Sequence, residues 1–296
     1  PVEFTDIPGG YKAFKISAGG MKGGHSGIDI AVGKANAIQV LGRTLRQIIK
    51  ENIDIRIADL KGGSAHNAIP RDAWTYVCVP GNEIEKVKKI VSQSCDTLRN
   101  EYKIKDPDIS ITLKDAAEGE ITKALTAAAT QKTVDFIMVI PHGVAAMSQE
   151  IKDLVETSNN LANISLENNA IRVLTSQRSS VISRLKAHTD RIEAAARVAG
   201  GEARSGDGYP PWQPNMDSPL LARSIALYEK LNNKKPVVEV IHAGLECGII
   251  GAKYPGMDMI SIGPTLKNPH SPEERINLKT VGKIWDFIVA LLKDLK

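Results

Sequence analysis

Two long alternating segments joined by a pair of asparagines place the strongest constraint on the fold. The segments LVETSNNLANISLE (154–167) and AIRVLTSQRS (170–179) flank Asn168 and Asn169. Alternation of apolar and polar side chains is typical of a half-buried strand, and asparagine accepts the backbone of a two-residue hairpin turn. Strands joined so closely run antiparallel. The sequence therefore predicts a sheet that is at least partly antiparallel.

The region 9–205 mixes strands and helices without a regular strand–helix–strand repeat. Period-two alternation predicts further strands, and apolar residues spaced three and four apart predict amphipathic helices. The strands are expected at 11–21, 53–60, 73–80 and 108–116, and the helices at 30–51, 82–102, 118–140 and 181–199. This pattern indicates an α+β domain whose antiparallel sheet is covered by helices.

The pattern changes after the glycine- and proline-rich stretch GGEARSGDGYPPWQPNMD. Helices at 218–232, 245–251 and 276–293 are expected to alternate with strands at 236–241 and 257–263, as in a three-layer α/β sheet. Residues 206–296 are too few for a complete domain of this kind, so they are interpreted as part of one. Residues 1–8 are assigned to a linker or the end of a preceding segment. Because the first residue is Pro1, we expect the chain to begin inside a longer protein.

Composition excludes several classes of partner. The chain has 296 residues, a net charge of +4 and 4% aromatic residues. Its basic and acidic side chains alternate, which argues against nucleic acid as a partner. No apolar run is long enough to span a bilayer and the start lacks a secretory pattern, so we expect a cytoplasmic location and no membrane. Cys78, Cys95 and Cys247 contain no CxxC pair and are expected to be reduced thiols.

Three residues of the C-terminal region could bind a ligand or a metal ion. His270 lies between two prolines after the expected strand 257–263, where α/β sheets place binding crevices. It is either a metal ligand or a cap for the next helix. His242 and Glu246 occupy a strand-to-helix turn with Gly244, and a helix N-terminus there could bind a carboxylate. The alternatives are a buried, hydrogen-bonded histidine and an acid that stabilises its own helix.

Polar residues of the first region offer a second set of candidates. His25 lies between glycines in KGGHSG, so it is either a hydrogen-bond donor to an oxyanion or an ordinary turn histidine. Asn67 lies before a proline turn and Arg178 ends the second hairpin strand. An amide and a guanidinium suit a peptide backbone and a carboxylate, although turn and surface roles remain open. HxH, HExxH, Walker and GxSxG motifs are absent.

Six motifs taken together resemble the aminoacyl-histidine dipeptidase family, also called Xaa-His dipeptidases or peptidase D. They are KGGHSGIDI, GGSAHNAIPRDA, VETSNNLANI, YPPWQPNMDSPLL, HAGLECGI and DMISIGPTLKNPHSPEERI. The similarity follows the whole chain in order. It places the chain in the carnosinase-related two-metal exopeptidases and implies a lid and dimerisation domain at 9–205. Residues 206–296 would then be the C-terminal part of the catalytic zinc-peptidase domain.

The resemblance also implies roles for the candidate residues. His270 would be a zinc ligand, while the remaining ligands of the two divalent ions and the glutamate base would lie on polypeptide outside this chain. His25 would reach the partner's active site in a homodimer and stabilise the oxyanion. Asn67 and Arg178 would contact substrate, and His242, Gly244 and Glu246 would line the pocket. The implied activity is hydrolysis of Xaa-His dipeptides; the alternative is a truncated lid module that dimerises without catalysis.

Overall fold

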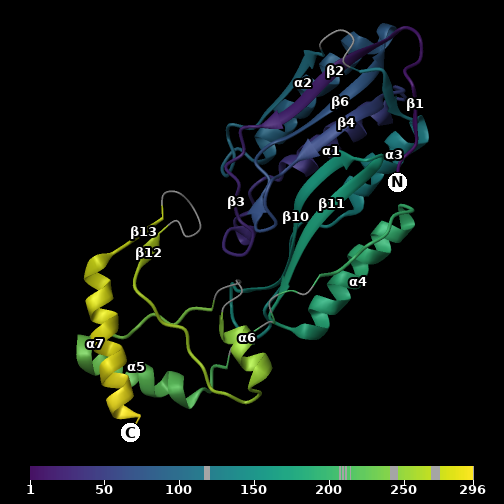
Figure 1. Ribbon diagram of the computed structural model, residues 1–296. Coiled ribbons are helices and arrows are strands. Elements are labelled where there is room, and N and C mark those ends of the chain that lie inside the picture. The colour runs from purple at the N-terminus through teal and green to yellow at the C-terminus, as the bar shows by residue number, and fades with distance from the viewer. Residues whose placement is uncertain are drawn as a thin grey trace. The chain divides into compact units, whose positions relative to one another are not determined.

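The chain divides into two compact units in the computed structural model (Figure 1). The first contains the residues up to Asp207, and the second contains most of the residues from Gly208 onwards. The structure describes residues 1–116, 121–206, 208, 210, 212–213, 215–240, 246–267 and 274–295.

The first unit is built on an antiparallel sheet, as the sequence predicts. Its strand order is β11-β10-β4-β6-β2-β7, and β9 pairs with the N-terminal part of β10. The strands are β2 (Tyr11–Gly19), β4 (Arg56–Gly62), β6 (Ala73–Pro80), β7 (Ser110–Asp115), β9 (Gly143–Met147), β10 (Val155–Glu167) and β11 (Ala170–Ser179). Every pairing within this sheet is antiparallel.

The hairpin of β10 and β11 is confirmed. Glu167 pairs with Ala170 across the turn. Asn168 and Asn169 have φ values of 51° and 57°, the left-handed backbone that this short turn requires. The turn fixes the register of both strands, and this register decides which side chains share a face of the pair.

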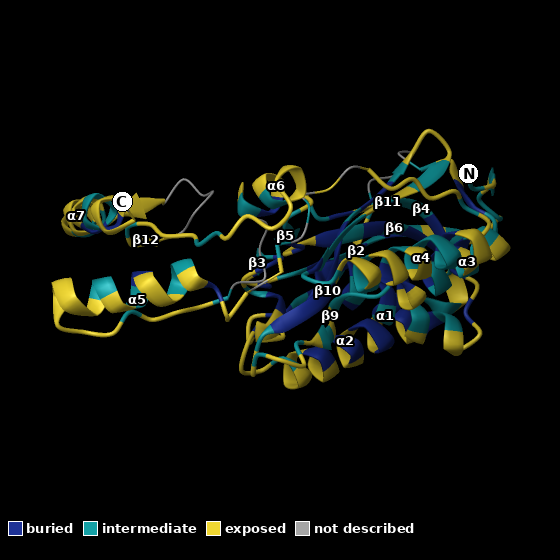
Figure 2. Ribbon diagram, turned by 90° about the horizontal axis from the view of Figure 1, so that it is seen from below, coloured by how far each residue is buried: buried dark blue, intermediate teal, exposed yellow. Residues whose placement is uncertain are grey.

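Four helices pack on the sheet and close the core of the first unit (Figure 2). They are α1 (Ala37–Lys50), α2 (Ile84–Glu101), α3 (Ala127–Val139) and α4 (Ile182–Val198). In β2, Phe14, Ile16 and Ala18 are buried while the residues between them are only partly covered. This alternation places the helices over one face, because burying a large apolar side chain contributes about 1.5–3 kcal/mol.

Helix α3 begins later than the sequence predicts. Residues Lys123–Leu125 form strand β8, which pairs with β1 (Phe4–Asp6). Thr126 then caps the helix, since its hydroxyl accepts a hydrogen bond from the backbone N–H of Ala129. The tertiary pairing with β1 therefore overrides the helical pattern at the start of the predicted range 118–140.

The second unit contains α5 (Pro219–Asn232), α6 (Glu246–Lys253) and α7 (Leu278–Asp294), close to their predicted positions. The strands predicted at 236–241 and 257–263 are not formed among the described residues. In the first of these ranges, the structure describes residues 236–240. Alternation favours extended backbone, but a strand also needs a neighbouring strand to bond with. The described part of this unit has only the pair β12 (Leu266–Lys267) and β13 (Arg275–Ile276), so it does not show the predicted three-layer sheet.

His142 makes the stability of the first unit depend on pH. Burial lowers the pKa of His142 to about 4, and its Nδ1 accepts a hydrogen bond from the N–H of Leu161 at 3.3 Å. An unfolded histidine has a pKa of about 6.5, so the folded state resists protonation. The contribution of neutral His142 to the free energy of unfolding is complete above about pH 6.5. It is lost as the pH falls towards 4, and the loss amounts to up to about 3 kcal/mol.

We expect His142→Asn to flatten this part of the pH dependence, because an amide oxygen can replace Nδ1 without titrating. The measurement is the free energy of unfolding of both proteins at several pH values between 7 and 4. Some dependence should remain, since burial also lowers the pKa of His188. Equal slopes for the variant and the wild type would assign the effect to other groups.

Candidate functional site

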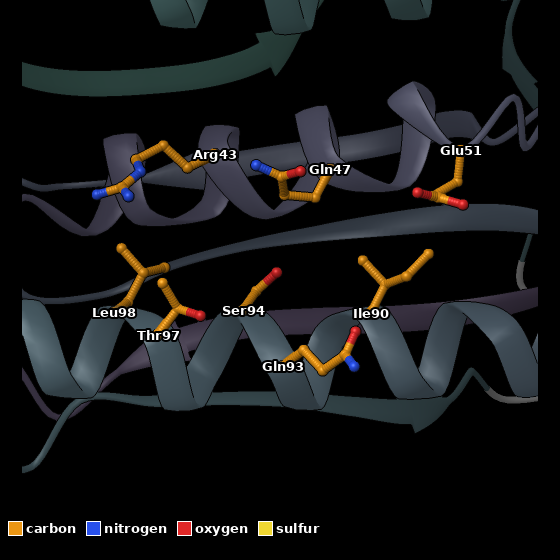
Figure 3. A pocket seen from close by; sticks show the side chains of 8 residues that line it. All are labelled: Arg43, Gln47, Glu51, Ile90, Gln93, Ser94, Thr97 and Leu98. Carbon is orange, nitrogen blue, oxygen red and sulfur yellow. The ribbon is translucent and has the colours of Figure 1, made fainter.

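A hollow lies between α1 and α2 on the first unit, and its charged side chains are already paired (Figure 3). Its volume is about 320 Å³. Two hydrogen bonds of 2.6 and 2.7 Å join the guanidinium of Arg43 on its wall to Glu101. This pairing raises the pKa of Arg43 and lowers that of Glu101. Glu51, the other charged residue that lines the hollow, pairs with Lys86 at 3.1 Å, so the hollow offers no unpaired charge to a ligand.

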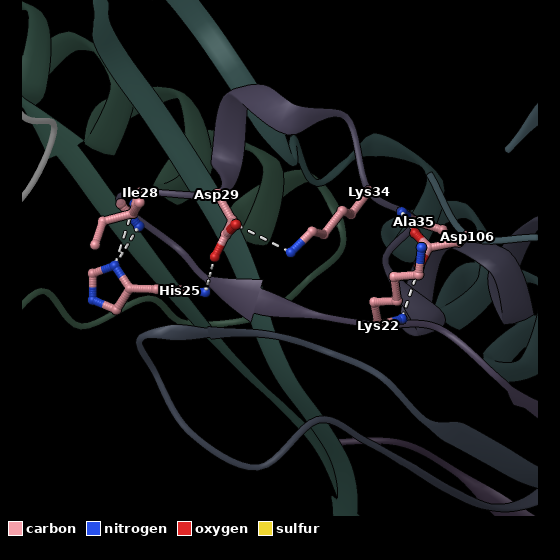
Figure 4. Close-up of polar contacts among 8 residues, drawn as sticks. Lys22, His25, Ile28, Asp29, Lys34, Ala35 and Asp106 are labelled. Atoms are coloured by element: carbon pink, nitrogen blue, oxygen red, sulfur yellow. Dashed lines mark hydrogen bonds and ion pairs between the residues drawn. The ribbon is translucent and has the colours of Figure 1, made fainter. Parts of the chain in front are cut away.

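The loop that carries His25 fixes the orientation of its imidazole ring (Figure 4). Strand β3 (Gly24–His25) pairs with β5 (Ala68–Ile69). Beyond β3 the chain turns back, so that Nδ1 of His25 accepts hydrogen bonds from the backbone N–H groups of Gly27 and Ile28, both at 3.2 Å. A neutral imidazole with an accepting Nδ1 carries its proton on Nε2. The loop therefore selects the tautomer that presents Nε2–H as a donor.

Asp29 closes the same loop through two hydrogen bonds to the backbone of His25, one from its side chain and one from its own backbone. Its carboxylate accepts a hydrogen bond from the N–H of His25 at 2.8 Å, and its own N–H donates to the carbonyl of His25 at 2.8 Å. Nζ of Lys34 lies 3.1 Å from Oδ1 of Asp29 and balances the charge of this carboxylate. Gly24 is required here, because it has φ +156° and a Cβ atom would lie 2.6 Å from Oδ2 of Asp29. One glycine of the KGGHSG motif thus gives the carboxylate access to the backbone.

Asp106 anchors the two ends of the segment around His25. Its carboxylate is fully buried and accepts hydrogen bonds from the N–H groups of Lys22 and Ala35, both at 2.7 Å. These partners lie 84 and 71 residues away in the sequence. Sequence reasoning missed Asp106, since nothing around it marks a carboxylate whose partners are so distant.

Three residues predicted to contact substrate meet around Ser26, which is buried. The N–H of Ser26 donates to the carbonyl of Asn67 at 2.8 Å, and Nη2 of Arg178 donates to the hydroxyl of Ser26 at 3.5 Å. Ser26 directly follows His25. The structure therefore brings His25, Asn67 and Arg178 together from a loop, a turn and the end of β11, all within the first unit.

The charge of Arg178 has no anionic partner among the described residues. Burial lowers the pKa of Arg178, and its Nε is buried without a hydrogen-bond partner in the described part of the chain. Ion pairs found within the described ranges involve other basic residues. A guanidinium remains charged even when partly buried, and an unpaired buried charge is costly. Arg178 is thus suited to bind an anionic group.

The candidate residues of the second unit are described only in part. His242, Gly244 and His270 lie outside the described residues. Glu246 begins α6, where an acidic side chain interacts favourably with the helix dipole. No group of three or more His, Cys, Asp and Glu side chains within the described ranges could hold a metal ion. The metal-ligand role of His270 therefore stays a prediction.

Comparison with known proteins identifies the relatives of the chain. Residues 16–106 match the peptidase dimerisation domain. The aminoacylhistidine dipeptidase of Vibrio alginolyticus has a similar structure with a TM-score of 0.89, 36% sequence identity and coverage of 99% of this chain. The cytosol non-specific dipeptidase of Escherichia coli (strain K12) is 35% identical over 98% of this chain. The chain is a relative of these dipeptidases.

The resemblance noted in the sequence is thereby confirmed over almost the whole chain. The chain spans 59% of the length of each of these two dipeptidases. The dimerisation match covers α1, β4, β6 and α2 as well as His25 and Asn67. No helix in the described part of this dipeptidase relative is both long and apolar enough to cross a membrane.

Proposed function

We propose that the chain forms the substrate-binding and dimerisation part of a metal-dependent dipeptidase that acts on Xaa-His and related dipeptides in the cytoplasm. The observation that supports this most directly is the partly buried guanidinium of Arg178, which has no anionic partner among the described residues and reaches the residue after His25. A dipeptide supplies the matching group, because it always ends in a carboxylate. Hydrogen bonds to a carboxylate, which are often bidentate, are among the strongest that arginine makes.

The first unit would contribute two functions to the reaction. Arg178 binds the substrate carboxylate and so orients the peptide bond. Nε2–H of His25, whose direction is set by Gly27 and Ile28, donates to the oxyanion that develops when the peptide carbonyl is attacked. Asn67, whose carbonyl accepts a hydrogen bond from the N–H of Ser26, would contact the substrate backbone.

The proposed metal chemistry needs more than this chain's described residues. Two divalent ions, expected to be Zn²⁺, would polarise the scissile carbonyl and activate water when bound. His270 is the residue of this chain proposed as a ligand, with His242, Gly244 and Glu246 beside the substrate. A single imidazole cannot hold zinc tightly, so the other ligands would come from outside these residues. The match to the dimerisation domain supports a homodimer. In this dimer His25 would act on the partner's site.

A non-catalytic dimerising module is the second candidate. It is favoured by the match of residues 16–106 to the peptidase dimerisation domain. The two candidates differ in a simple assay with the protein that the intact gene encodes, purified with Zn²⁺. Hydrolysis of Xaa-His dipeptides that stops on chelation supports the dipeptidase, whereas a stable dimer without hydrolysis supports the module.

Substrate amidation tests the role of Arg178. We expect the wild type to cleave a dipeptide about a hundredfold more efficiently than its C-terminal amide, as judged by kcat/KM, because the amide cannot neutralise the guanidinium. Arg178→Met should lose this preference. Arg172→Met is a matched control, since Arg172 also lies on β11 but is exposed. Equal preference in Arg178→Met and the wild type would contradict carboxylate binding by Arg178.

A further inference from the structure

Strand β10 carries an unusual run of buried polar side chains, from Glu156 to Asn160. Most of them have clear partners. Glu156 pairs with Arg184 at 3.1 Å, and the hydroxyl of Thr157 lies 3.0 Å from that of Ser179. Asn160 differs, because it is 1% exposed and its Oδ1 has no hydrogen-bond partner in the described part of the chain.

The orientation of the Asn160 amide is determined by its surroundings. Its Nδ2 donates to the carbonyl oxygens of His66 at 3.1 Å and Ala68 at 2.8 Å. Two carbonyl oxygens can only accept, so the amide nitrogen must face them and the alternative orientation is excluded. Oδ1 therefore points away from this loop. A buried acceptor left unpaired costs about 1–3 kcal/mol, which calls for an explanation.

The register of the hairpin places Asn160 on the same face as Arg178. Ser158 pairs with Arg178, and Asn160 pairs with Ser176. Residues directly opposite each other, and those two positions along a strand, share a face of the sheet. This face meets the His25 loop through Arg178, which reaches Ser26, and the Asn67 turn through Asn160, which donates to the carbonyls on either side of Asn67.

The two unpaired atoms on this face are complementary in type. Nε of Arg178 is a donor on a positive group, and Oδ1 of Asn160 is an acceptor. A ligand that satisfies both carries an anion and an N–H group. A water molecule could bond to either atom but would not neutralise the guanidinium. The C-terminal residue of a dipeptide combines a carboxylate with a peptide N–H, and a histidine there adds an imidazole N–H.

We propose that Asn160 is a substrate-binding residue that accepts a hydrogen bond from an N–H group of the same residue whose carboxylate binds Arg178. This inference rests on the proposed function and adds a residue that selects substrates. The shared chemistry is an N–H donor on a carboxylate-bearing residue. The peptide nitrogen and the imidazole ring are its two possible sources.

The test compares substrates with and without each N–H in the intact enzyme. Glycyl-histidine is compared with glycyl-4-thiazolylalanine, which keeps the ring size but lacks the ring N–H, and with the analogue methylated on the peptide nitrogen. We expect one of these changes to lower the kcat/KM of the wild type by about tenfold to a hundredfold, as for a lost hydrogen bond at a buried acceptor. The change with this effect identifies the donor.

In Asn160→Ala the same change of substrate should alter kcat/KM by less than about twofold, since the acceptor is already absent. Asn160→Ser is a second variant in case the first folds poorly, because its hydroxyl can still donate to one loop carbonyl. Asn163→Ala is the matched control. Asn163 lies on the same strand and donates to the carbonyl of Gly63 at 3.0 Å, so its loss perturbs the neighbouring loop backbone but should leave the discrimination intact.

The outcomes separate the two proposals. Unchanged discrimination in both Asn160 variants, with dipeptides still hydrolysed, would overturn the role of Asn160 and leave the dipeptidase function standing. The role of Asn160 would also be overturned if the wild type hydrolysed both analogues as efficiently as glycyl-histidine. If the intact protein hydrolyses no dipeptide, the proposed function fails and the inference fails with it.

Discussion

Replacing His25 by alanine in the intact enzyme is expected to lower kcat by about a hundredfold to a thousandfold, the usual effect of losing one oxyanion donor. The expectation follows from the loop geometry. Gly27 and Ile28 donate to Nδ1, so the donor Nε2–H is formed and oriented before substrate binds. A donor fixed in advance needs no reorganisation when charge develops on the substrate oxygen.

Metal content distinguishes this role from a general loss of structure. We expect His25→Ala to bind as much zinc as the wild type, because His25 is proposed to act on the substrate and not on the metal ions. His66→Ala is a suitable control, since the exposed His66 takes part in the site through its backbone carbonyl. A kcat for His25→Ala equal to that of the wild type would refute the proposed role.

The tautomer of His25 can be examined without any activity. Nitrogen chemical shifts of the ring in this chain should show an accepting Nδ1 and a protonated Nε2 at neutral pH. The opposite tautomer would show that Gly27 and Ile28 do not hold the ring as described. Such a result would weaken the catalytic proposal independently of any kinetic measurement.

Local signals in the sequence were sufficient where the physics is local. The Asn168-Asn169 turn depends on two residues that tolerate positive φ, so the hairpin and its antiparallel direction could be predicted. Strand β6 and helix α4 were likewise placed within a residue or two, because each shows one unbroken period. The glycines beside His25 marked a loop with a special backbone, and Gly24 indeed makes room for a carboxylate.

Features that depend on distant partners could not be predicted in this way. The range 257–263 alternates as a strand should, yet no strand in the described part of the chain pairs with it. Asn160 gave no separate signal within a strand-like pattern, since its contacts lie 92 and 94 residues earlier. Arg178 could be proposed from its residue type. The lack of a carboxylate beside it became visible only once the fold had placed its surroundings.

Asp106 illustrates the same limit and leads to the largest expected effect on stability. Its buried carboxylate is the acceptor for the N–H groups of Lys22 and Ala35, which flank the His25 loop. Asp106→Ala would leave two backbone donors without a partner, and each buried unpaired donor costs about 1–3 kcal/mol. We therefore expect the free energy of unfolding of the first unit to fall by about 3 kcal/mol.

The measurement is hydrogen exchange of peptides from α1 and α2 at increasing urea concentration, because these helices report on the first unit alone. Asp108→Ala is the control. Asp108 is exposed two residues further on, and its replacement should change the stability by less than about 0.5 kcal/mol. Asp106→Asn should recover part of the loss, since its amide keeps one accepting oxygen but turns the other position into a donor. If Asp106→Ala and Asp108→Ala exchange alike, the two hydrogen bonds of Asp106 do not hold the loop, and the fixed orientation of His25 needs another cause.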